Sequence, residues 1–374
     1  MQLIVCGLGG AGSRLAEALV VADSRGQRSS VADSVALDTD ERSLSDLERI
    51  PNEHRHLYGV LESSGRGFDG HRDRGREVAN EELTELFRAV DDLETSRGDA
   101  FLLCTGLAGA TGATLLPHLA AKLRTVFEIP IYGLGVLPDT DVNENEGDET
   151  GTQVDRAVNA GLAIDSVTEA TDSLLLFDNA LWTKTTETDS EPEVRAGLNE
   201  TVATRVTALF KAGETDRSGR VAESVVDASE VINTLSGGGI ASLGYASQEI
   251  DRPTKSRFGL GLFMQDKKLD ETTAIKAIET TVRRAVNGKL TVDVDRGLVQ
   301  RGLLVTAGPP EWLNRQAIAD ARSWLAQETS SVEIRGGDIP TPDTDTIVAL
   351  VVLAGVGNCQ RIAELRTAAA DSIE

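Results

Sequence analysis

GLGGAG, at residues 7–12, stands between the apolar run 2–6 and the helically periodic run 13–21. A short apolar run is typical of a buried strand, and apolar residues at helical spacing indicate a helix. Glycines let the backbone turn tightly and come close to a phosphate, and the first turn of a helix offers free N–H groups and a positive dipole end. The pattern therefore predicts a strand–turn–helix unit that binds a nucleotide phosphate. Asp38, after the next strand, is the candidate ribose-binding acid if the ligand is a dinucleotide.

A second glycine-rich segment, GLAGATGAT at 106–114, follows the apolar run 100–104 and precedes a helical pattern that extends to about residue 126. A dinucleotide needs one phosphate-binding turn, whereas two turns facing one crevice suit the longer chain of a triphosphate. Close packing of a helix on a sheet is the alternative explanation of these glycines. The lysine-bearing P-loop pattern is absent, so a Walker-type NTPase is excluded.

A pair of acids, Asp227 and Glu230 in VDASE, forms a third candidate site. Their three-residue spacing places both carboxylates on one side of a turn or helix. Such a pair can polarise a water for attack on a γ-phosphate or help to hold a cation. It is equally the pattern of a solvated acidic face or a helix N-cap, and in so acidic a chain the residues alone favour that second interpretation.

Short apolar strands alternate with helices along the chain, which predicts an α/β fold with a parallel sheet covered on both faces. The first half has expected strands at 2–6, 34–37, 100–104, 130–137 and 173–177, and expected helices at 13–21, 77–93 and 112–126. The second half has expected helices at 192–212, 222–235, 272–287, 311–327 and one ending at 370, and expected strands at 242–246, 302–307, 332–334 and 347–354. Residues 65–75 and 138–153 are expected to be loops.

Composition limits the classes of partner. The 60 acidic residues outnumber the 37 basic ones, which gives a net charge of -23. This charge repels phosphate backbones and anionic membrane surfaces, so nucleic-acid binding is not expected. Many acids, few lysines and 4% aromatic residues suit a salty cytoplasm, in which salt screens self-repulsion.

Three scattered cysteines, Cys6, Cys104 and Cys359, suit buried thiols in a reducing compartment. The longest apolar run, residues 347–357, is shorter than the roughly 20 residues that cross a bilayer. We therefore expect a soluble, cytoplasmic protein without membrane insertion.

In this order and spacing, the motifs resemble the tubulin/FtsZ superfamily, and specifically its archaeal CetZ branch. The first turn is similar to the opening turn of that family, LDTD at 37–40 to its Asn-Thr-Asp turn, and the segment from Gly65 to Arg76 to the loop that contacts the γ-phosphate. The segment 106–114 stands in the place of the GGGTGSG-type signature loop. The further segments that resemble CetZ sequence are YGLGVLP at 132–138, LFDN at 176–179, VDASE at 226–230 and INTL at 232–235.

The resemblance implies a tubulin/FtsZ fold: a Rossmann-like GTP-binding domain over 1–190, a central helix over 191–213, an acidic catalytic region over 214–240 and a smaller α/β domain with a mixed sheet over 241–374. It implies GTP or GDP with Mg²⁺ as ligands. It also implies head-to-tail filaments in which the next subunit completes the hydrolytic site, with a role in cell shape or motility. Other tubulin-like or FtsZ-like proteins are the further partners it suggests.

Residue by residue, the resemblance gives Asp227 and Glu230 the catalytic role. It assigns nucleotide contacts to Gly9, Gly10, Ala11, Arg14, Asp38, Gly65, Arg66, Gly67, Gly106, Ala108, Gly109, Ala110, Thr111, Gly112, Asn179 and Asn199. Arg195 stands where the family has a base-stacking aromatic, with the base-reading amide of Asn199 four residues on. Glu146 and Glu149 are both candidates for the ribose-contacting acid. Mg²⁺ is expected with the phosphates, since the sequence holds no all-protein metal cage.

Alternatives follow from departures in the second turn, where Ala108, Ala110, Ala113 and Thr114 replace glycine or serine. A Cβ restricts how closely backbone approaches a phosphate, so nucleotide binding is expected rather than fast hydrolysis. One alternative is a non-hydrolysing homologue that acts as a structural or regulatory partner of other filaments. Another is an NAD-dependent oxidoreductase, which rests on the first turn alone and lacks an obvious catalytic histidine.

Overall fold

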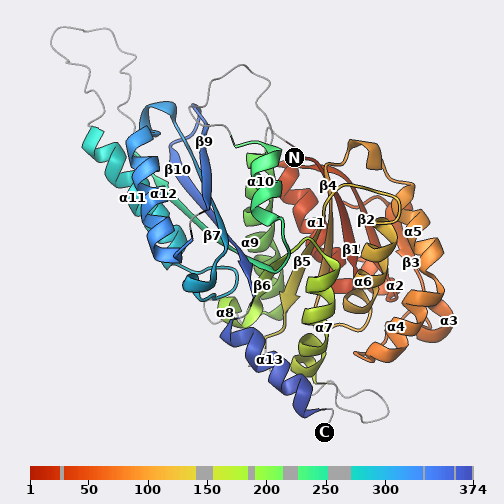
Figure 1. The fold of residues 1–374 in the computed structure, drawn as a ribbon. Helices are drawn as coiled ribbons and strands as arrows, with labels where there is room; N and C mark the ends of the chain where they lie inside the picture. The colour runs from red at the N-terminus through yellow and green to blue at the C-terminus, as the bar shows by residue number, and fades with distance from the viewer. Residues whose placement is uncertain are drawn as a thin grey trace.

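The computed structural model describes residues 1–25, 29–139, 155–183, 190–213, 226–251, 271–331, 333–357 and 359–372. Its strands form one sheet in the order β3-β2-β1-β4-β5-β6-β7-β10-β8-β9. Helices cover both faces of this sheet, and the long helix α9 (Glu191–Ala212) lies between its two halves (Figure 1). The fold is therefore α/β, as the sequence predicts, and the mixed strand directions that the resemblance implies for the second half belong to this same sheet.

The first half of the sheet is parallel throughout. Its central strands are buried on both faces, which explains why they read as continuous apolar runs. The strands are β1 (Leu3–Leu8), β2 (Val31–Asp38), β3 (Arg55–Leu57), β4 (Ala100–Gly106), β5 (Ile131–Leu137) and β6 (Ser173–Asp178).

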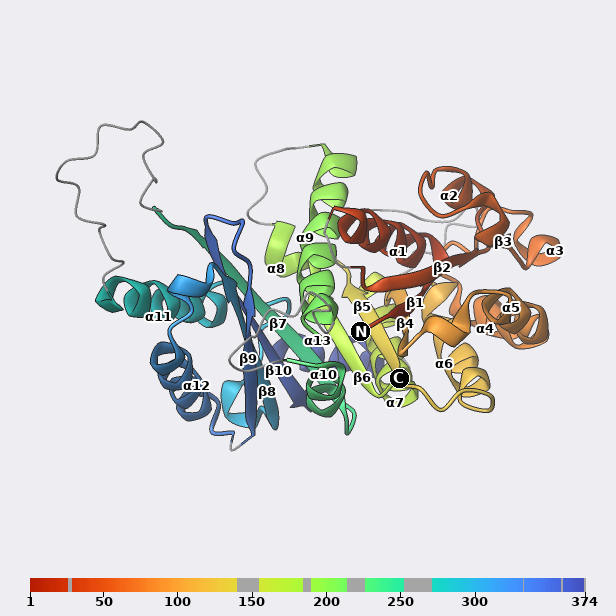
Figure 2. The same cartoon turned by 90° about the horizontal axis from the view of Figure 1, so that it is seen from above.

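Successive side chains of β1 pack alternately into two different hydrophobic cores. Leu3 and Val5 belong to one core, with residues of α1 (Gly9–Ser24) and α9, whereas Ile4 and Cys6 belong to the other. The second core includes residues of α6 (Gly112–Leu123) and α7 (Arg156–Ala170). Seen from above, α1 and α9 lie on one side of the strands and α6 and α7 on the other (Figure 2). The carboxyl ends of the strands are left for the connecting loops.

The second half of the sheet begins at β7 (Ile240–Glu249), which runs parallel to β6 over two residue pairs. Next to it lie the antiparallel β10 (Thr346–Val356), then β8 (Arg301–Gly308) and β9 (Ile334–Pro340), which are parallel to each other. The helices α11 (Glu271–Asn287) and α12 (Arg315–Thr329) pack on one face, and α13 (Gln360–Asp371) packs back on α7. The remaining helices are α2 (Glu41–Ser45), α3 (Val60–Ser63), α4 (Arg72–Glu81), α5 (Leu83–Asp91), α8 (Asn179–Thr183) and α10 (Ala228–Leu235).

The predicted helix 77–93 is wrong as a single element. Two helices, α4 and α5, meet at Glu82, whose φ of -93° and ψ of 5° interrupt the helical backbone. The Glu82 carboxylate accepts a hydrogen bond from the Gly59 amide at 3.0 Å, which holds this residue toward another loop. Because α4 begins at Arg72, the predicted loop 65–75 is also too long.

Three further predicted boundaries need correction. The strand expected at 332–334 runs over Ile334–Pro340. The helix expected at 311–327 begins at Arg315, because the Asn314 side chain caps it by accepting the Ala317 amide. The helix expected at 222–235 begins at Ala228, and residues 214–225 lie outside the described ranges.

The helices and the cysteine thiols bear on the environment that the chain suits. No helix in the described ranges is long and apolar enough to cross a bilayer. Cys6, Cys104 and Cys359 are free and buried, as predicted, and burial raises the pKa of the Cys104 thiol well above its usual value. These thiols are therefore packing groups, not nucleophiles.

Candidate nucleotide site and acidic end

The two glycine-rich turns meet at the carboxyl ends of neighbouring strands. β1 and β4 are adjacent and parallel, with Leu8 opposite Thr105. A Cβ on Gly112 would lie 2.0 Å from the Leu8 carbonyl oxygen, and one on Gly106 would lie 2.8 Å from the Ala11 methyl. These glycines therefore let the two turns pack closely, as the close-packing explanation also requires, and a shared phosphate site stays a prediction.

Both helices that leave these turns have N-termini without a side-chain cap. Leu8 and Thr111 precede α1 and α6, and neither side chain accepts a hydrogen bond from the helix amides. Neither first turn contains an acidic residue. The N-termini of α1 and α6, each with N–H groups that no side chain caps and with the positive end of a helix dipole, thus lie side by side. This arrangement favours the binding of an anion with more than one phosphate group.

Two further segments lie beside the second glycine-rich turn, at the turn after β2, where the hydroxyl of Thr39 contacts that of Thr111. The Thr39 carbonyl accepts the Gly67 amide at 3.0 Å, and the Gly65 carbonyl accepts the Glu41 amide at 3.0 Å. An isolated bridge pairs Asp40 with Arg66. The structure therefore brings Gly65, Arg66 and Gly67 beside the LDTD turn.

Asp38 is buried, with 2% of its surface exposed. Its Oδ1 accepts the Thr39 amide at 2.7 Å, while its Oδ2 has no hydrogen-bond partner within the described ranges. Burial raises the pKa of Asp38 to about 7. One oxygen of Asp38 is therefore bonded to its own turn, and its predicted contact with a nucleotide stays a prediction.

Arg14 connects the first turn to the central helix. A Cβ on Gly10 would lie 3.4 Å from its Nη1. Burial lowers the pKa of Arg14, and the charge of Arg195 on α9 adds to this effect. Arg195 itself pairs with Glu191, one turn earlier on α9. Asn199 is half-buried one turn after Arg195, so the start of α9 lies beside the first turn.

The remaining predicted nucleotide residues are placed as follows. Ala108 and Gly109 belong to the second turn, and Asn179 begins α8 at the carboxyl end of β6. Glu146 and Glu149 lie outside the described residues, so the ribose-contacting acid stays a prediction.

Asn159, which sequence reasoning missed, ties two loops of the site together. This buried side chain on α7 donates to the Gly70 carbonyl at 2.9 Å and to the Ala108 carbonyl at 3.2 Å. An asparagine inside a helical pattern carries no local signal for such a role. Only the packing of α7 beside the second turn gives it one.

Arg72, at the first position of α4, was also missed, although it lies inside the segment assigned to the γ-phosphate loop. Only 7% of its surface is exposed, and its Nε and Nη1 have no hydrogen-bond partner within the described ranges. Burial lowers its pKa to about 10. Gly75, one turn later, packs against the Ala110 carbonyl, so this face of α4 lies on the second turn.

The acidic pair lies at the other end of the molecule. The Met1 ammonium donates to the Phe210 carbonyl at 3.3 Å, so the start of β1 lies beside the end of α9. A Cβ on Gly213 would lie 3.2 Å from the Ala228 Cα, which places the start of α10 there too. Asp227 and Glu230 thus sit near the amino ends of the strands, and the glycine turns sit at their carboxyl ends.

Asp227 and Glu230 make different contacts. Asp227 caps α10, because its Oδ1 accepts the Glu230 amide at 3.1 Å and the Ser229 hydroxyl at 2.5 Å. The bond from Ser229 is the main cause that lowers the pKa of Asp227. Glu230 pairs through Oε2 with Arg335 Nη1 of β9 at 3.0 Å. The N-cap interpretation that the sequence left open is therefore correct for Asp227, while the carboxylate of Glu230 is bonded to β9.

Comparison with known proteins agrees with this architecture. Residues 2–187 match the Tubulin/FtsZ family GTPase domain, and residues 191–371 match the tubulin-like CetZ C-terminal domain. Tubulin-like protein CetZ5 of Haloferax volcanii is 38% identical over 100% of this chain and 92% of its own length. The chain belongs to the CetZ branch of the tubulin/FtsZ family. The family predicted from the sequence motifs is thereby confirmed.

Two solved CetZ proteins of Haloferax volcanii are similar over the whole chain. The GDP-bound monomer of CetZ1 has a TM-score of 0.84 and 33% identity, and covers 100% of both chains. The GTPγS-bound protofilament of CetZ2 has a TM-score of 0.83 and 32% identity, and covers 100% of this chain and 98% of that one. The predicted tubulin/FtsZ fold is confirmed for this CetZ chain.

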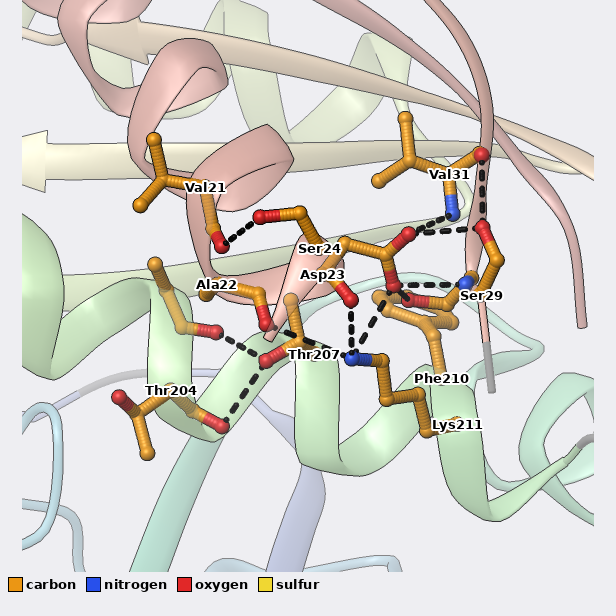
Figure 3. A network of polar contacts seen from close by, with 12 residues as sticks. Val21, Ala22, Asp23, Ser24, Ser29, Val31, Thr204, Thr207, Phe210 and Lys211 are labelled. Carbon is orange, nitrogen blue, oxygen red and sulfur yellow. Dashed lines mark hydrogen bonds and ion pairs between the residues drawn. The ribbon is translucent and has the colours of Figure 1, made fainter. Parts of the chain in front are cut away.

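In this CetZ chain, a buried polar network fixes the end of α9 (Figure 3). Lys211 Nζ lies 3.2 Å from Asp23 Oδ1 and donates to the Asp23 carbonyl at 3.0 Å. Asp23 also accepts the Ser30 amide at 2.7 Å. Burial acts to raise the pKa of Asp23, but the bonds from Ser30 and Ser29 and the Lys211 charge outweigh it and lower the pKa. The network ties the end of α9 to the end of α1 and the start of β2.

Proposed function

We propose that this chain binds GTP at the crevice of the two glycine-rich turns and assembles head to tail into filaments that hydrolyse GTP between subunits. The supporting observation is the separation of the two half-sites. α9 runs from beside Arg14 to beside Met1, and its 22 residues span about 33 Å at ~1.5 Å per residue. Glu230 of one molecule therefore cannot serve the phosphates of that same molecule, whereas a head-to-tail neighbour brings the two half-sites together.

In the proposed binding half-site, backbone N–H groups of Gly9, Gly10 and Ala11 face the phosphates from one turn, and those of Thr111 and Gly112 from the other. Arg14 and Asn199 stand at the side where α9 begins, and Asn179 at the end of β6. Among the described residues no cluster of His, Cys, Asp and Glu could hold a metal by itself. In this proposal Mg²⁺ enters with the phosphate oxygens, because it offsets their charge.

The alanines of the second turn do not obstruct this cradle. No alanine between 106 and 114 has a positive φ. Ala110 and Ala113 are buried in the hydrophobic core, and the Thr114 hydroxyl donates to the Ala110 carbonyl at 2.5 Å. Ala110, Ala113 and Thr114 are thus taken up by the packing of α6, which supports the compatibility of these three departures with bound GTP, whereas Ala108 is half-buried in the turn itself.

In the proposed catalytic half-site, Glu230 of the next subunit accepts a proton from the water that attacks the γ-phosphate. Asp227 contributes by capping α10, which fixes the helix that carries Glu230. The solved relatives named above are a GDP-bound monomer and a GTPγS-bound protofilament, which is the pair of states such a cycle needs.

We infer the same domain division as the motifs suggest, at 190, 213 and 240. The two family matches separate between 187 and 191, at the start of α9, which supports the first of these boundaries.

The proposed setting is the cytoplasm, supported by three free buried thiols. The proposed role is in cell shape or motility, alone or together with other tubulin-like filaments.

The test measures GTP hydrolysis and filament assembly by the chain in molar KCl. We expect GTP or GDP to co-purify with the chain, light scattering with GTP above a threshold concentration, and phosphate release that follows assembly. Glu230→Ala should retain GTP and lose most phosphate release, because binding and activation lie on different subunits. Filaments without phosphate release would favour the non-hydrolysing alternative, and a chain that neither binds GTP nor assembles would contradict the proposal.

A further inference from the structure

We propose that Arg335 on β9 is a positioning residue that orients the Glu230 carboxylate toward the neighbouring subunit. The inference rests on the proposed hydrolysis between subunits and adds to it a residue of the C-terminal sheet. Arg335 is 105 positions from Glu230 in the chain, and its Nη1 donates to Glu230 Oε2 at 3.0 Å.

The guanidinium of Arg335 is itself held in place. Its Nη2 donates to Glu333 Oε1 at 2.7 Å, and Glu333 Oε2 lies 3.6 Å from the Nε of Arg301 on β8. Acid and base thus alternate along Glu230, Arg335, Glu333 and Arg301. An arginine that bridges two carboxylates has a fixed plane, so it directs its partners in a way that a single flexible ion pair does not.

Burial distinguishes this pair from an ordinary surface ion pair. The side chains of Arg335 and Glu230 are 28% and 33% exposed, against 64% and 68% for Arg88 and Glu85 on α5. The Nε of Arg335 is buried as well. Partial burial and the second carboxylate restrict the guanidinium, so the pair has the defined direction that an orienting role needs, whatever it adds to stability.

The contact leaves one oxygen of Glu230 for chemistry. Oε2 is taken by Arg335, and Oε1 has no hydrogen bond within the described ranges. A general base must lie within hydrogen-bond reach of the proton that it accepts. Because Asp227 fixes the first turn of α10 and Arg335 fixes Oε2, the direction of Oε1 is set before a neighbour arrives. Such preorganisation reduces the freedom lost in reaching the transition state.

The test compares Arg335→Gln and Arg335→Lys with the matched control Arg88→Gln, which removes the same charge and breaks an ion pair with Glu85 on α5. We expect Arg335→Gln to lower phosphate release per assembled subunit by roughly ten- to a hundredfold, since a misplaced catalytic group loses about this much. The KM for GTP, GTP retention and the threshold concentration for assembly should stay within twofold or so of the unmodified chain. Arg335→Lys should recover part of the rate, and Arg88→Gln should leave it unchanged.

A second measurement separates positioning from stability. In a Glu230→Gln background, Arg335→Gln should have no further effect on phosphate release, because it acts through the group already removed. If the two substitutions lowered phosphate release by factors that multiply, the proposal would be overturned. It would also be overturned if Arg335→Gln released phosphate as fast as the unmodified chain, and the proposed function would then still stand. Filaments of the unmodified chain that release no phosphate would contradict both.

Discussion

The hydroxyl oxygens of Thr39 and Thr111 lie 2.7 Å apart, although 72 positions separate the two residues. Thr39 follows β2 and Thr111 precedes α6, so one buried hydrogen bond joins the LDTD turn to the second glycine-rich turn. Both side chains are almost fully buried, at 0% and 9% exposed. The relative position of the two loops at the proposed phosphate site therefore depends on this pair.

Replacing one hydroxyl of this pair should cost more than replacing both. Thr111→Val leaves the Thr39 hydroxyl buried without its partner, which costs about 1–3 kcal/mol, whereas removing both partners can be nearly neutral. Denaturant unfolding of Thr39→Val, Thr111→Val and the double variant should give a double variant that is clearly more stable than the sum of the single losses predicts. Strictly additive losses would show that the two hydroxyls do not interact.

Close approach of the two turns gives the second prediction. A Cβ at Gly112 would lie 2.0 Å from the Leu8 carbonyl oxygen, so Gly112→Ala must push α6 away from the first turn. We expect a loss of several kcal/mol in unfolding free energy, of the order seen for overpacked sites, and loss of retained nucleotide.

Gly197 offers the matched control, because no atom lies within 4 Å of a Cβ built there and it sits inside α9. Gly197→Ala should stabilise the chain by about 0.5–1 kcal/mol, the usual gain for this change in a helix. Equal stability changes in the two variants would contradict the packing described for the turns.

Protonation of Asp38 should make stability depend on pH. Its pKa is about 7 in the folded chain because of burial, against about 3.9 unfolded, so the folded state holds a proton that the unfolded state has released. Stability from this group is therefore highest below pH ~4, falls as pH rises from ~4 to ~7, and levels off above that range.

Asp38→Asn removes this dependence while it keeps an oxygen for the Thr39 amide. Between pH 5 and pH 8, the unfolding free energy of the variant, measured in denaturant, should rise relative to that of the unmodified chain by on the order of a few kcal/mol. The control is Asp73→Asn, whose side chain is fully exposed. A pH profile that Asp38→Asn leaves unchanged would place the titration elsewhere.

The parts of the fold that the sequence predicts are those with local causes. Glycines beside apolar runs specify both turns, because tight turning and close approach are properties of the glycine itself. The apolar strands are recognisable because strands buried on both faces have no polar alternation. The strand 332–334 was misplaced because β9 reads IRGGDIP, in which two glycines and an aspartate hide the strand pattern.

The parts that the sequence does not predict depend on distant partners. The break between α4 and α5 accompanies a bond from the Gly59 amide to Glu82, 23 positions away. Asn159 acts through two carbonyls of separate loops, and Arg335 through an acid on another element. No spacing rule connects such residues, and only the assembled sheet brings them together.

Arg72 supplies the last prediction, on ligand binding and stability together. Its guanidinium is buried and, among the residues that the structure describes, its Nε and Nη1 have no hydrogen-bond partner, which is an unfavourable state for a charged group unless an anion occupies the site. Two contacts place the residue close to the second turn. The Asn159 side chain donates to the carbonyls of Gly70 and Ala108. Gly75, one turn further along α4, packs on the Ala110 carbonyl. We therefore expect Arg72 to contact the phosphate chain of a bound nucleotide.

Arg72→Met should then move two measurements in opposite directions. The nucleotide-free chain should become more stable to denaturant, because an unpaired buried charge is removed. Affinity for GTP, measured by titration in molar KCl, should fall by about tenfold or more, since a charge-assisted bond to phosphate contributes about 1.5–3 kcal/mol. Arg74→Met, an exposed neighbour on the same helix, should change neither measurement. A nucleotide affinity that Arg72→Met leaves intact would exclude Arg72 from the site, whatever its effect on stability.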